Sequence, residues 1–252
     1  MNIEVILSPA ELPSLAKRDL SKTVCVVFDV LRATTSMVTA LANGAKGIIP
    51  VSEIPEAMTI KQRQPDVLLA GERHGLRITA KQSGGLDFDL GNSPREFTRD
   101  KVAGKTIATT TTNGTRALRS CAHAKFVLAC TFANLGATAE FIVGLDAGEL
   151  LVICAGTFEE AAYEDILCAG ALCDLLWTHF DSGEVADSAQ VARQIFLSAK
   201  SDLRGAVQTH SKNARRLLAN PELRDDVEFC LRRDTNGVVA QMFADGIIQQ
   251  VK

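Results

Sequence analysis

The sequence is poor in aromatic residues, and its cysteines form no C-x-x-C pair. Only 5% of the 252 residues are Phe, Trp or Tyr while 46% are hydrophobic, so the core has to be built from Ala, Val, Leu and Ile. The seven cysteines are an odd number. We therefore expect them to be reduced and mostly buried, in a cytoplasmic protein.

An excess of basic charge and long apolar runs are also missing. The formal net charge is −3, which argues against a broad nucleic-acid surface and requires any anion site to be a local concentration of Arg. The stretch MNIEVILSPAEL has no basic leader and predicts a first strand, not a signal. No segment is long enough to cross a membrane. We expect neither nucleic acid nor a membrane as a partner.

Short apolar runs alternate with helical segments along most of the chain. Buried strands are predicted at KTVCVVFDV, KGIIPV, DVLLAGE, KTIATT, AKFVLAC and ELLVICAG. Beyond Gly156 helices dominate, beginning with EEAAYEDILCAGALCDLLWTHF, until GVVAQMF and GIIQQV predict two short closing strands. The alternation predicts an α/β fold in α/β/α layers with mainly parallel sheets.

One sequence pattern occurs twice. VCVVFDVLRATTSMVTAL and KTIATTTTNGTRAL each pass from an apolar strand, through a corner with threonines and an arginine, into a helix. Two similar halves that face each other would place both corners on a shared cleft. Because α/β proteins repeat such corners by necessity, the pattern alone does not establish a duplication. We expect a single unit over residues 1–252, with any halves at 1–100 and 101–252.

The second corner has two readings. A strand, a turn with Asn113-Gly114 and a helix start together present backbone N–H groups and hydroxyls toward an anion. An ordinary strand–turn–helix corner with cap residues explains the same stretch. The choice depends on whether other strands end in the same way.

Charged residues do follow other predicted strands, where α/β proteins place their sites. Asp29 ends CVVFDV and Glu72 ends VLLAGE, while Glu164-Asp165 lie inside the helix after ELLVICAG. Each has a structural alternative: a cap, a surface pair or a solvated helix face. Together they favour one cleft for an anion and a metal ion. The residues that we expect in it are Asp29, Arg32, Glu72, Arg73, Asn92, Ser93, Thr110, Thr111, Thr112, Asn113, Gly114, Thr115, Arg116 and Asp165.

These residue types indicate phosphoryl transfer. Carboxylate oxygens without nearby His or Cys ligands favour Mg²⁺ over Zn²⁺, and Arg with backbone donors favours a phosphate or another polyanion. We expect Asp29, Glu72 and Asp165 to be catalytic and to hold Mg²⁺. The threonine corner, with Arg32 and Arg116, is expected to neutralise the phosphoryl charge.

Three familiar phosphate chemistries do not fit the sequence. TTTTNGTR lacks the first Gly and the Lys of a Walker loop. Asp29 is followed two residues later by Leu31, where an aspartyl-phosphate enzyme of the haloacid dehalogenase type has a second Asp. No cysteine has an Arg six positions later, which is the spacing of a cysteine phosphatase. All three chemistries are disfavoured.

A histidine phosphatase is the closer alternative. ERHGLR carries the Arg-His-Gly triplet with a following Arg, in which His74 would take the phosphoryl group without Mg²⁺. Such enzymes need a second His, usually followed by an acid, whereas His123, His179 and His210 are followed by Ala, Phe and Ser. The triplet also comes after about two βα units instead of opening the fold. We assign His74 no chemical role and retain this reading as the alternative.

Five stretches, in order, resemble one family. VVFDVLRATTS, LLAGERHGL, FDLGNSP, TTTNGTRAL and CAGTFEEAAYEDILCAG look like the successive motifs of the 2-phosphosulfolactate phosphatases of coenzyme M biosynthesis. The resemblance runs from about Val26 to Gly170 and continues more loosely through FCLRRDTNGVVAQMFADGII. It implies a Mg²⁺-dependent acid phosphatase that converts (2R)-2-phospho-3-sulfolactate to 3-sulfolactate and phosphate. It also implies an α/β fold of two similar halves with the site between them.

Two stretches depart from the family pattern. Residues 77–88 lengthen the link between the second and third motifs, which we expect to reshape one wall of the pocket. Val238-Val239 stands where the family commonly has Val-Pro, which we expect to alter how the last strands close. The exact substrate stays open, because family members also occur where coenzyme M is not made.

The expected ligand is a small polyanionic phosphate ester. Arg32, Arg73 and Arg116 are expected to converge on its charges, whereas Arg77 and Arg95 are expected on the surface. We allow for a homodimer. A non-catalytic anion-binding homologue is the other class of function, and phosphate release from a generic ester would separate it from an enzyme.

Overall fold

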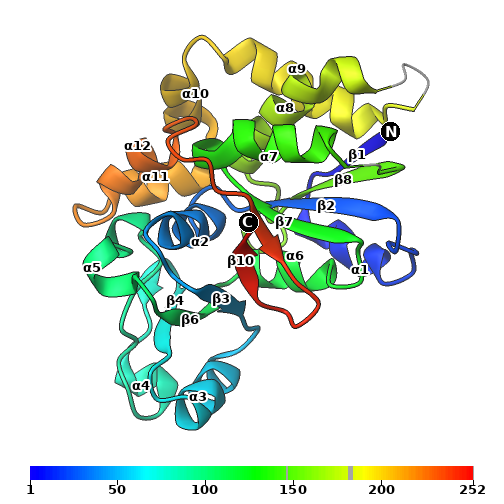
Figure 1. The fold of residues 1–252 in the computed structure, drawn as a ribbon. Helices are drawn as coiled ribbons and strands as arrows, with labels where there is room; N and C mark the ends of the chain where they lie inside the picture. The colour runs from blue at the N-terminus through cyan, green and yellow to red at the C-terminus, as the bar shows by residue number, and fades with distance from the viewer. Residues whose placement is uncertain (146, 181–183, 252) are drawn as a thin grey trace.

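The strands form one continuous sheet in the computed structural model, which describes residues 1–145, 147–180 and 184–251. Over these residues the sheet has ten strands in the order β1-β8-β2-β7-β9-β10-β3-β6-β4-β5 (Figure 1). The strands are β1 (Asn2–Ile6), β2 (Thr23–Phe28), β3 (Gly47–Pro50), β4 (Leu68–Arg73), β5 (Leu76–Arg77), β6 (Thr106–Thr110), β7 (Phe126–Cys130), β8 (Glu149–Cys154), β9 (Ala240–Met242) and β10 (Ile248–Gln250).

The sheet contains two parallel groups that run in opposite directions. β1, β8, β2 and β7 pair in parallel, and so do β3, β6 and β4. The β9–β10 hairpin joins the groups through antiparallel pairings of β7 with β9, β9 with β10 and β10 with β3, which reverses the direction. The two closing strands predicted from the sequence therefore lie in the middle of the sheet (Figure 1, red). Strands from both sides of residue 100 contribute to each group.

Helices pack on both faces of the sheet. Along β2, Val24, Val26 and Phe28 pack against α7, α8 and α9, whereas Cys25 and Val27 face α2 and α6 on the other side. A strand buried on both faces reads as a continuous apolar run, as TVCVVF does. The predicted α/β/α layering with a mainly parallel sheet is confirmed. The helices are α1 (Leu12–Leu15), α2 (Ala33–Ala42), α3 (Ile54–Arg63), α4 (Ala80–Ser83), α5 (Arg99–Val102), α6 (Gly114–Ser120), α7 (Leu135–Val143), α8 (Tyr163–Leu176), α9 (Asp187–Ala199), α10 (Leu203–His210), α11 (Lys212–Leu218) and α12 (Arg224–Cys230).

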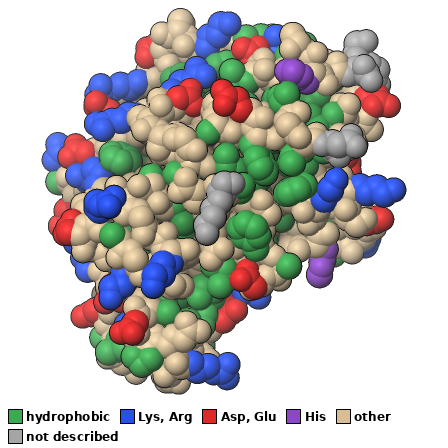
Figure 2. Space-filling view, in the orientation of Figure 1, with side chains coloured by type: hydrophobic (Ala, Val, Ile, Leu, Met, Phe, Trp, Pro, Cys, Tyr) green, Lys and Arg blue, Asp and Glu red, His purple; other side chains and the backbone are tan. Residues whose placement is uncertain are grey.

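The state of the cysteines and the distribution of surface charge agree with what the composition predicts. All seven cysteines are buried and unpaired. Within the described ranges, no helix has the length and hydrophobicity needed to span a bilayer. On the face shown in Figure 2, Lys and Arg side chains are interspersed with Asp and Glu. The charge is therefore not gathered into one field on that face.

The carboxyl ends of the two parallel groups meet. In a flat sheet, two groups of strands that run in opposite directions would have their carboxyl ends on opposite sides of the sheet, one group at the top of the strands and the other at the bottom. Here a Cβ atom added to Gly114, just beyond β6, would lie 2.6 Å from Oδ2 of Asp29, just beyond β2. The side-chain amide of Asn113 also donates to the carbonyl of Ala155, just beyond β8, at 3.1 Å. The two corners that repeat one sequence pattern thus face each other across a shared cleft, as predicted.

Candidate active site

A cavity lies where the strand ends meet, and its wall contains part of the predicted site. Its wall comes from the corner after β2, the β4–β5 turn, the segment before η2 (Pro94–Glu96), the corner after β6, the loop after β8 and helix α11. The predicted residues in the wall are Asp29, Arg32, Glu72, Asn92, Thr111, Thr112 and Asn113. The structure places the other predicted residues outside it: Arg73, Ser93, Thr110, Gly114, Thr115, Arg116 and Asp165.

Asp29 presents one carboxylate oxygen to this cavity. Its Oδ1 accepts a hydrogen bond from the backbone N–H of Ala33 at 2.9 Å, so Asp29 also caps the start of α2, as the structural alternative proposed. Within the described chain, Oδ2 accepts no hydrogen bond. It faces Gly114, where any Cβ atom would lie 2.6 Å from it. Gly114 is therefore required by this close approach, and Oδ2 is available to a ligand.

The surroundings of Asp29 disfavour its negative charge. The pKa of Asp29 is raised to about 7, mainly by burial; the hydrogen bond from the Ala33 N–H acts to lower it, and the charges of Glu72 and Glu164 act to raise it. The guanidinium of Arg32 lowers it again by a smaller amount. A cation bound at Oδ2 would stabilise the negatively charged form of this carboxylate.

Glu72 ties the β4–β5 turn to the threonine corner. Its Oε1 accepts hydrogen bonds from the backbone N–H and the hydroxyl of Thr112, at 2.9 and 2.8 Å. Its Oε2 accepts from the backbone N–H of Gly75 at 2.6 Å. Both oxygens of Glu72 therefore hold the cavity wall in place, and the side chain links the end of β4 to the corner after β6.

Asp165 lies behind the cavity and joins two of its loops. The residue was expected inside a helix, but α8 begins at Tyr163, which puts Asp165 in the first turn. Its Oδ1 accepts from the N–H of Val30 at 2.8 Å and its Oδ2 from the N–H of Gly156 at 3.0 Å. Burial, followed by the charges of Glu164 and Asp29, raises the pKa of Asp165 well above its usual range. Asp165 thus fixes the corner after β2 to the loop after β8.

The three predicted metal ligands do not form one cage. Among the described residues, no three His, Cys, Asp or Glu side chains are grouped so as to hold a metal ion. Both oxygens of Glu72 and of Asp165 also accept hydrogen bonds from protein groups. Mg²⁺ usually keeps several waters and binds through one or two carboxylates with substrate oxygens. Asp29 with Glu72 fits that requirement, and Asp165 supports the site from behind.

The threonine corner is a clamp as well as a wall. Asn113 donates through Nδ2 to the carbonyl of Phe158 at 2.7 Å and accepts its N–H at 3.1 Å through Oδ1. The hydroxyl of Thr115 donates to the carbonyl of Thr111 at 3.1 Å, which closes the turn into α6. The hydroxyl of Thr110 donates to the carbonyl of Ser52 at 3.1 Å. Most polar groups of the corner therefore bind the protein itself.

The predicted arginines do not converge on the cavity. Arg116 pairs with Glu159 and lines a separate surface hollow beside α1. Arg73 donates to the carbonyl of Glu72 at 2.8 Å and to the hydroxyl of Thr110 at 3.1 Å. Only Arg32 reaches the wall.

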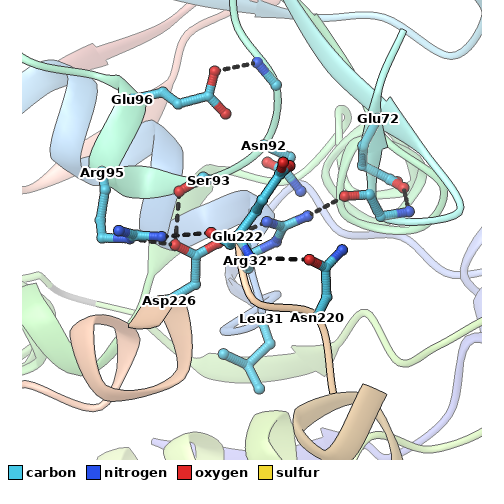
Figure 3. A network of polar contacts seen from close by, with 12 residues as sticks. Leu31, Arg32, Glu72, Asn92, Ser93, Arg95, Glu96, Asn220, Glu222 and Asp226 are labelled. Atoms are coloured by element: carbon cyan, nitrogen blue, oxygen red, sulfur yellow. Dashed lines mark hydrogen bonds and ion pairs between the residues drawn. The ribbon is translucent and has the colours of Figure 1, made fainter. Parts of the chain in front are cut away.

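Arg32 and Arg95 share a buried carboxylate that the sequence did not reveal. Asp226, on α12, is fully buried and accepts from Arg32 Nη1, Ser93 Oγ and Arg95 Nε, each at 2.7 Å (Figure 3). Arg95 also donates to the carbonyl of Glu222 at 2.7 Å. Ser93 therefore belongs to this network and not to the cavity. In the sequence Asp226 reads as an ordinary acid at a helix start.

Helix α11 supplies two cavity residues that the sequence analysis missed. Asn213 and Arg216 line the wall, and Arg216 Nη2 donates to Asn213 Oδ1 at 2.8 Å. KNARRLL reads as a surface helix, and only an Asn on its buried side would have drawn attention to it.

Comparison with known proteins identifies the family of the chain. The model of the 2-phosphosulpholactate phosphatase family matches residues 10–244. A protein of Caldicellulosiruptor saccharolyticus named "Probable 2-phosphosulfolactate phosphatase" is 37% identical over 238 residues, which are 92% of this chain and 93% of its own. A protein of the same name from Thermotoga petrophila is 41% identical over 209 residues, which are 83% of this chain and 84% of its own. Another, from Clostridium acetobutylicum, is 34% identical over 242 residues, which are 96% of this chain and 97% of its own. The chain belongs to the 2-phosphosulfolactate phosphatase family.

Membership in this family confirms the resemblance and weakens the histidine-phosphatase alternative. His74 lies in the β4–β5 turn and lines the cavity, with a left-handed backbone at φ 56°. No second histidine lines the cavity among the described residues. The chemistry of a histidine phosphatase therefore lacks its second group here.

The longer segment at residues 77–88 does not line the cavity. It forms α4 between β5 and Phe88, which packs with α3 and β4 in a separate small core. None of these residues lies in the cavity wall. The segment therefore does not form a wall of this cavity, and its expected effect on the pocket stays a prediction.

Proposed function

We propose that the chain is a Mg²⁺-dependent phosphatase that hydrolyses 2-phospho-3-sulfolactate, or a related phosphorylated 2-hydroxy acid, to the hydroxy acid and phosphate. The observation that carries this proposal is the placement of Asp29 in a member of this family. Its Oδ2 faces the cavity with no hydrogen-bond partner among the described residues, and two sequence motifs converge on it. Such an oxygen is suited to phosphoryl transfer.

Asp29 has two possible chemical roles with the same products. In the first, Oδ2 attacks phosphorus, the ester P–O bond breaks, the leaving alkoxide takes a proton, and water then releases phosphate from the aspartyl intermediate. In the second, Oδ2 takes a proton from a water that attacks phosphorus directly. Acid quenching during turnover distinguishes the two roles, because only the first leaves phosphate bound to the protein.

Mg²⁺ is proposed to bind beside Asp29 and Glu72. When bound, it would neutralise charge that spreads over the transferring oxygens. The protein contributes the positions: Glu72 holds Thr112 at the cavity wall, and Asp165 holds the corner that contains Asp29 to the loop after β8. Groups that are held in place before the reaction contribute to rate because they need no rearrangement during it.

The test is phosphate release from 2-phospho-3-sulfolactate by the purified protein, with Mg²⁺ and after exhaustive EDTA treatment. We expect turnover that is lost with EDTA and restored by Mg²⁺. Activity that survives EDTA would favour His74 as nucleophile, in which case His74→Ala would abolish it. Binding of 3-sulfolactate without any turnover would instead identify a non-catalytic homologue.

Two wider expectations belong to this proposal. A cytoplasmic location fits cysteines that are all buried and unpaired. Sedimentation or light scattering in solution would test the homodimer.

A further inference from the structure

Arg216 is the cavity arginine that forms no ion pair with a carboxylate in the described part of the chain. The other cavity arginine, Arg32, pairs through Nη1 with Asp226 and donates through Nη2 to the carbonyl of Gly75, each at 2.7 Å. Arg216 forms no ion pair with any described Asp or Glu, and its hydrogen bond to Asn213 uses Nη2. Its Nε and Nη1 donors therefore remain for a ligand.

The position of Arg216 is fixed by a buried amide. Arg216 Nη2 donates to Oδ1 of Asn213, which is 6% exposed. The Nδ2 of the same amide donates to the carbonyl of Leu31 at 2.6 Å and to Oε1 of Glu164 at 3.2 Å. Ser211 donates to the other oxygen of Glu164 at 2.6 Å. Because both amide hydrogens are used, the oxygen of Asn213 faces Arg216 and holds the guanidinium at the cavity.

Gly75 brings the two arginines together. A Cβ atom added there would lie 3.8 Å from Nη2 of Arg216 and 3.9 Å from Nη2 of Arg32. Gly75 itself has a left-handed backbone at φ 83°, held by the bond from its N–H to Glu72. Both guanidinium groups therefore lie within 4 Å of the same point beside the β4–β5 turn. The cavity has a positive side there, in addition to the carboxylate of Asp29.

We infer that Arg216 is a specificity-determining residue that binds the carboxylate or sulfonate of the substrate, separately from its phosphate. This inference rests on the function proposed above. Asp29 is 8% exposed and is assigned to the phosphoryl group, whereas Arg216 is exposed and reaches the cavity from α11. A guanidinium binds carboxylate or sulfonate oxygens through parallel N–H donors. A substrate that carries such a group beside its phosphate would meet both.

The experiment compares Arg216→Ala with the wild type on three esters at one Mg²⁺ concentration. 2-Phosphosulfolactate carries a carboxylate and a sulfonate, 2-phospholactate only the carboxylate, and glycerol 2-phosphate neither. We expect kcat/KM for 2-phosphosulfolactate to fall at least about tenfold, mainly through KM, and that for glycerol 2-phosphate to change less than about threefold. The kcat/KM for 2-phospholactate falls as well if Arg216 binds the carboxylate, and it is unchanged if Arg216 binds the sulfonate. Arg216→Lys should restore part of the loss.

Arg215→Ala is the matched control. Arg215 is the neighbouring exposed arginine of α11, donates to the carbonyl of Thr209 and lies outside the cavity wall. Its kinetics should equal those of the wild type. An equal loss on all three esters in Arg216→Ala, or no loss on any, would overturn the inference.

Failure of the proposed function gives a different result. If the wild type hydrolyses none of the three esters, the phosphatase proposal is wrong. Calorimetric binding of 3-sulfolactate then tests Arg216 alone. Weaker binding by Arg216→Ala than by the wild type would support its role, and equal or no binding by both proteins would overturn it.

Discussion

The two strand-end corners resemble each other in sequence and differ in what their polar groups do. After β2, Asp29 uses Oδ1 to cap α2 and leaves Oδ2 at the cavity. After β6, Asn113 uses both amide atoms to hold the loop after β8, and Thr115 bonds back to Thr111. One corner presents the carboxylate oxygen that we propose to be reactive, so we call it the reactive corner, and the other builds the wall around it. A shared pattern thus specifies the same turn without specifying the same role.

The arginines of the two corners point in different directions because they stand at different positions relative to the start of the following helix. Arg32 precedes the first residue of α2, lines the cavity and pairs with the buried Asp226 behind its wall. Arg116 is the third residue of α6 and points outward to Glu159. Because each helical residue turns by about 100°, a difference of a few positions is enough to change the face.

Asp29→Asn is expected to have the largest effect and tests the reactive corner. Asn keeps an oxygen to cap α2 but loses the charge and basicity of Oδ2. We expect kcat to fall by at least about 10³-fold with 2-phosphosulfolactate, as for other removed catalytic groups. Steady-state kinetics with circular dichroism of the variant would check this. A variant that keeps more than about a tenth of the wild-type rate would remove Asp29 from the chemistry.

Asp226→Ala tests how the reactive corner is supported. Removing this carboxylate leaves the guanidinium of Arg32, 3% exposed, without its ion-pair partner. Breaking a buried pair in this way destabilises by about 3–5 kcal/mol. Urea unfolding should show this loss, whereas Asp225→Ala, at an exposed neighbouring position, should change the free energy of unfolding by less than about 1 kcal/mol. Equal effects of the two variants would contradict the buried network.

Gly114→Ala tests the contact between the corners. Its Cβ would lie 2.6 Å from Asp29 Oδ2 and also 2.6 Å from the Cβ of Ala33, so the corners must separate. A displacement of about 1 Å at the site can cost about 10²-fold in rate. We expect a loss of that order in kcat/KM. Gly237→Ala is the control, because a Cβ there meets nothing within 4 Å; a wild-type rate in Gly114→Ala would mean that the corners need not touch.

The charge of Asp29 also predicts a pH dependence of stability without Mg²⁺. The folded state raises the pKa of Asp29 from 3.8 to about 7, so it binds more protons than the unfolded state between these values. Its contribution to stability is present below the unfolded pKa and is lost as pH rises toward 7. The free energy of unfolding of Asp29→Asn, taken relative to that of the wild type, should therefore increase by about 2–3 kcal/mol from pH 5 to pH 8 in EDTA. Urea unfolding at both pH values measures this, and a constant difference would show that Asp29 is charged throughout.

Arg116→Ala should have the smallest effect. The sequence pattern predicts a loss of about 10²–10³-fold, because Arg116 stands in a phosphate-binding motif. The structure places the side chain outside the cavity, so we expect kcat/KM to change by less than about threefold. A loss of a hundredfold would mean that Arg116 turns inward when substrate binds.

The strands and the reactive corner could be predicted from the sequence because their signals are local. Apolar runs such as TVCVVF mark buried strands, and Asp29 stands at the end of one. Asp226 and Arg216 could not be found in this way, since they reach the site from α12 and α11 only through the tertiary fold. The opposite direction of the two parallel groups was equally hidden, because it depends on where the β9–β10 hairpin inserts.

The hydrogen-bond partners of individual polar groups are the feature that the sequence predicts least well. The sequence predicts Glu72 and Asp165 as acids of the site; Glu72 lines the cavity, and Asp165 lies behind it. Their oxygens, however, accept backbone N–H groups from segments that are distant in sequence. A sequence shows that a carboxylate is present but not which donors reach it, so the expected three-carboxylate metal cage could not be tested before the fold was known.

The most direct test of the central claim is a crystal structure with Mg²⁺, phosphate and 3-sulfolactate bound together. The claim is that catalysis occurs between the two corners, at Oδ2 of Asp29. We predict phosphate and Mg²⁺ in the cavity in contact with Oδ2, and the sulfolactate extending toward Arg216. Phosphate bound against His74 without Mg²⁺, or in the hollow beside Arg116, would contradict the account.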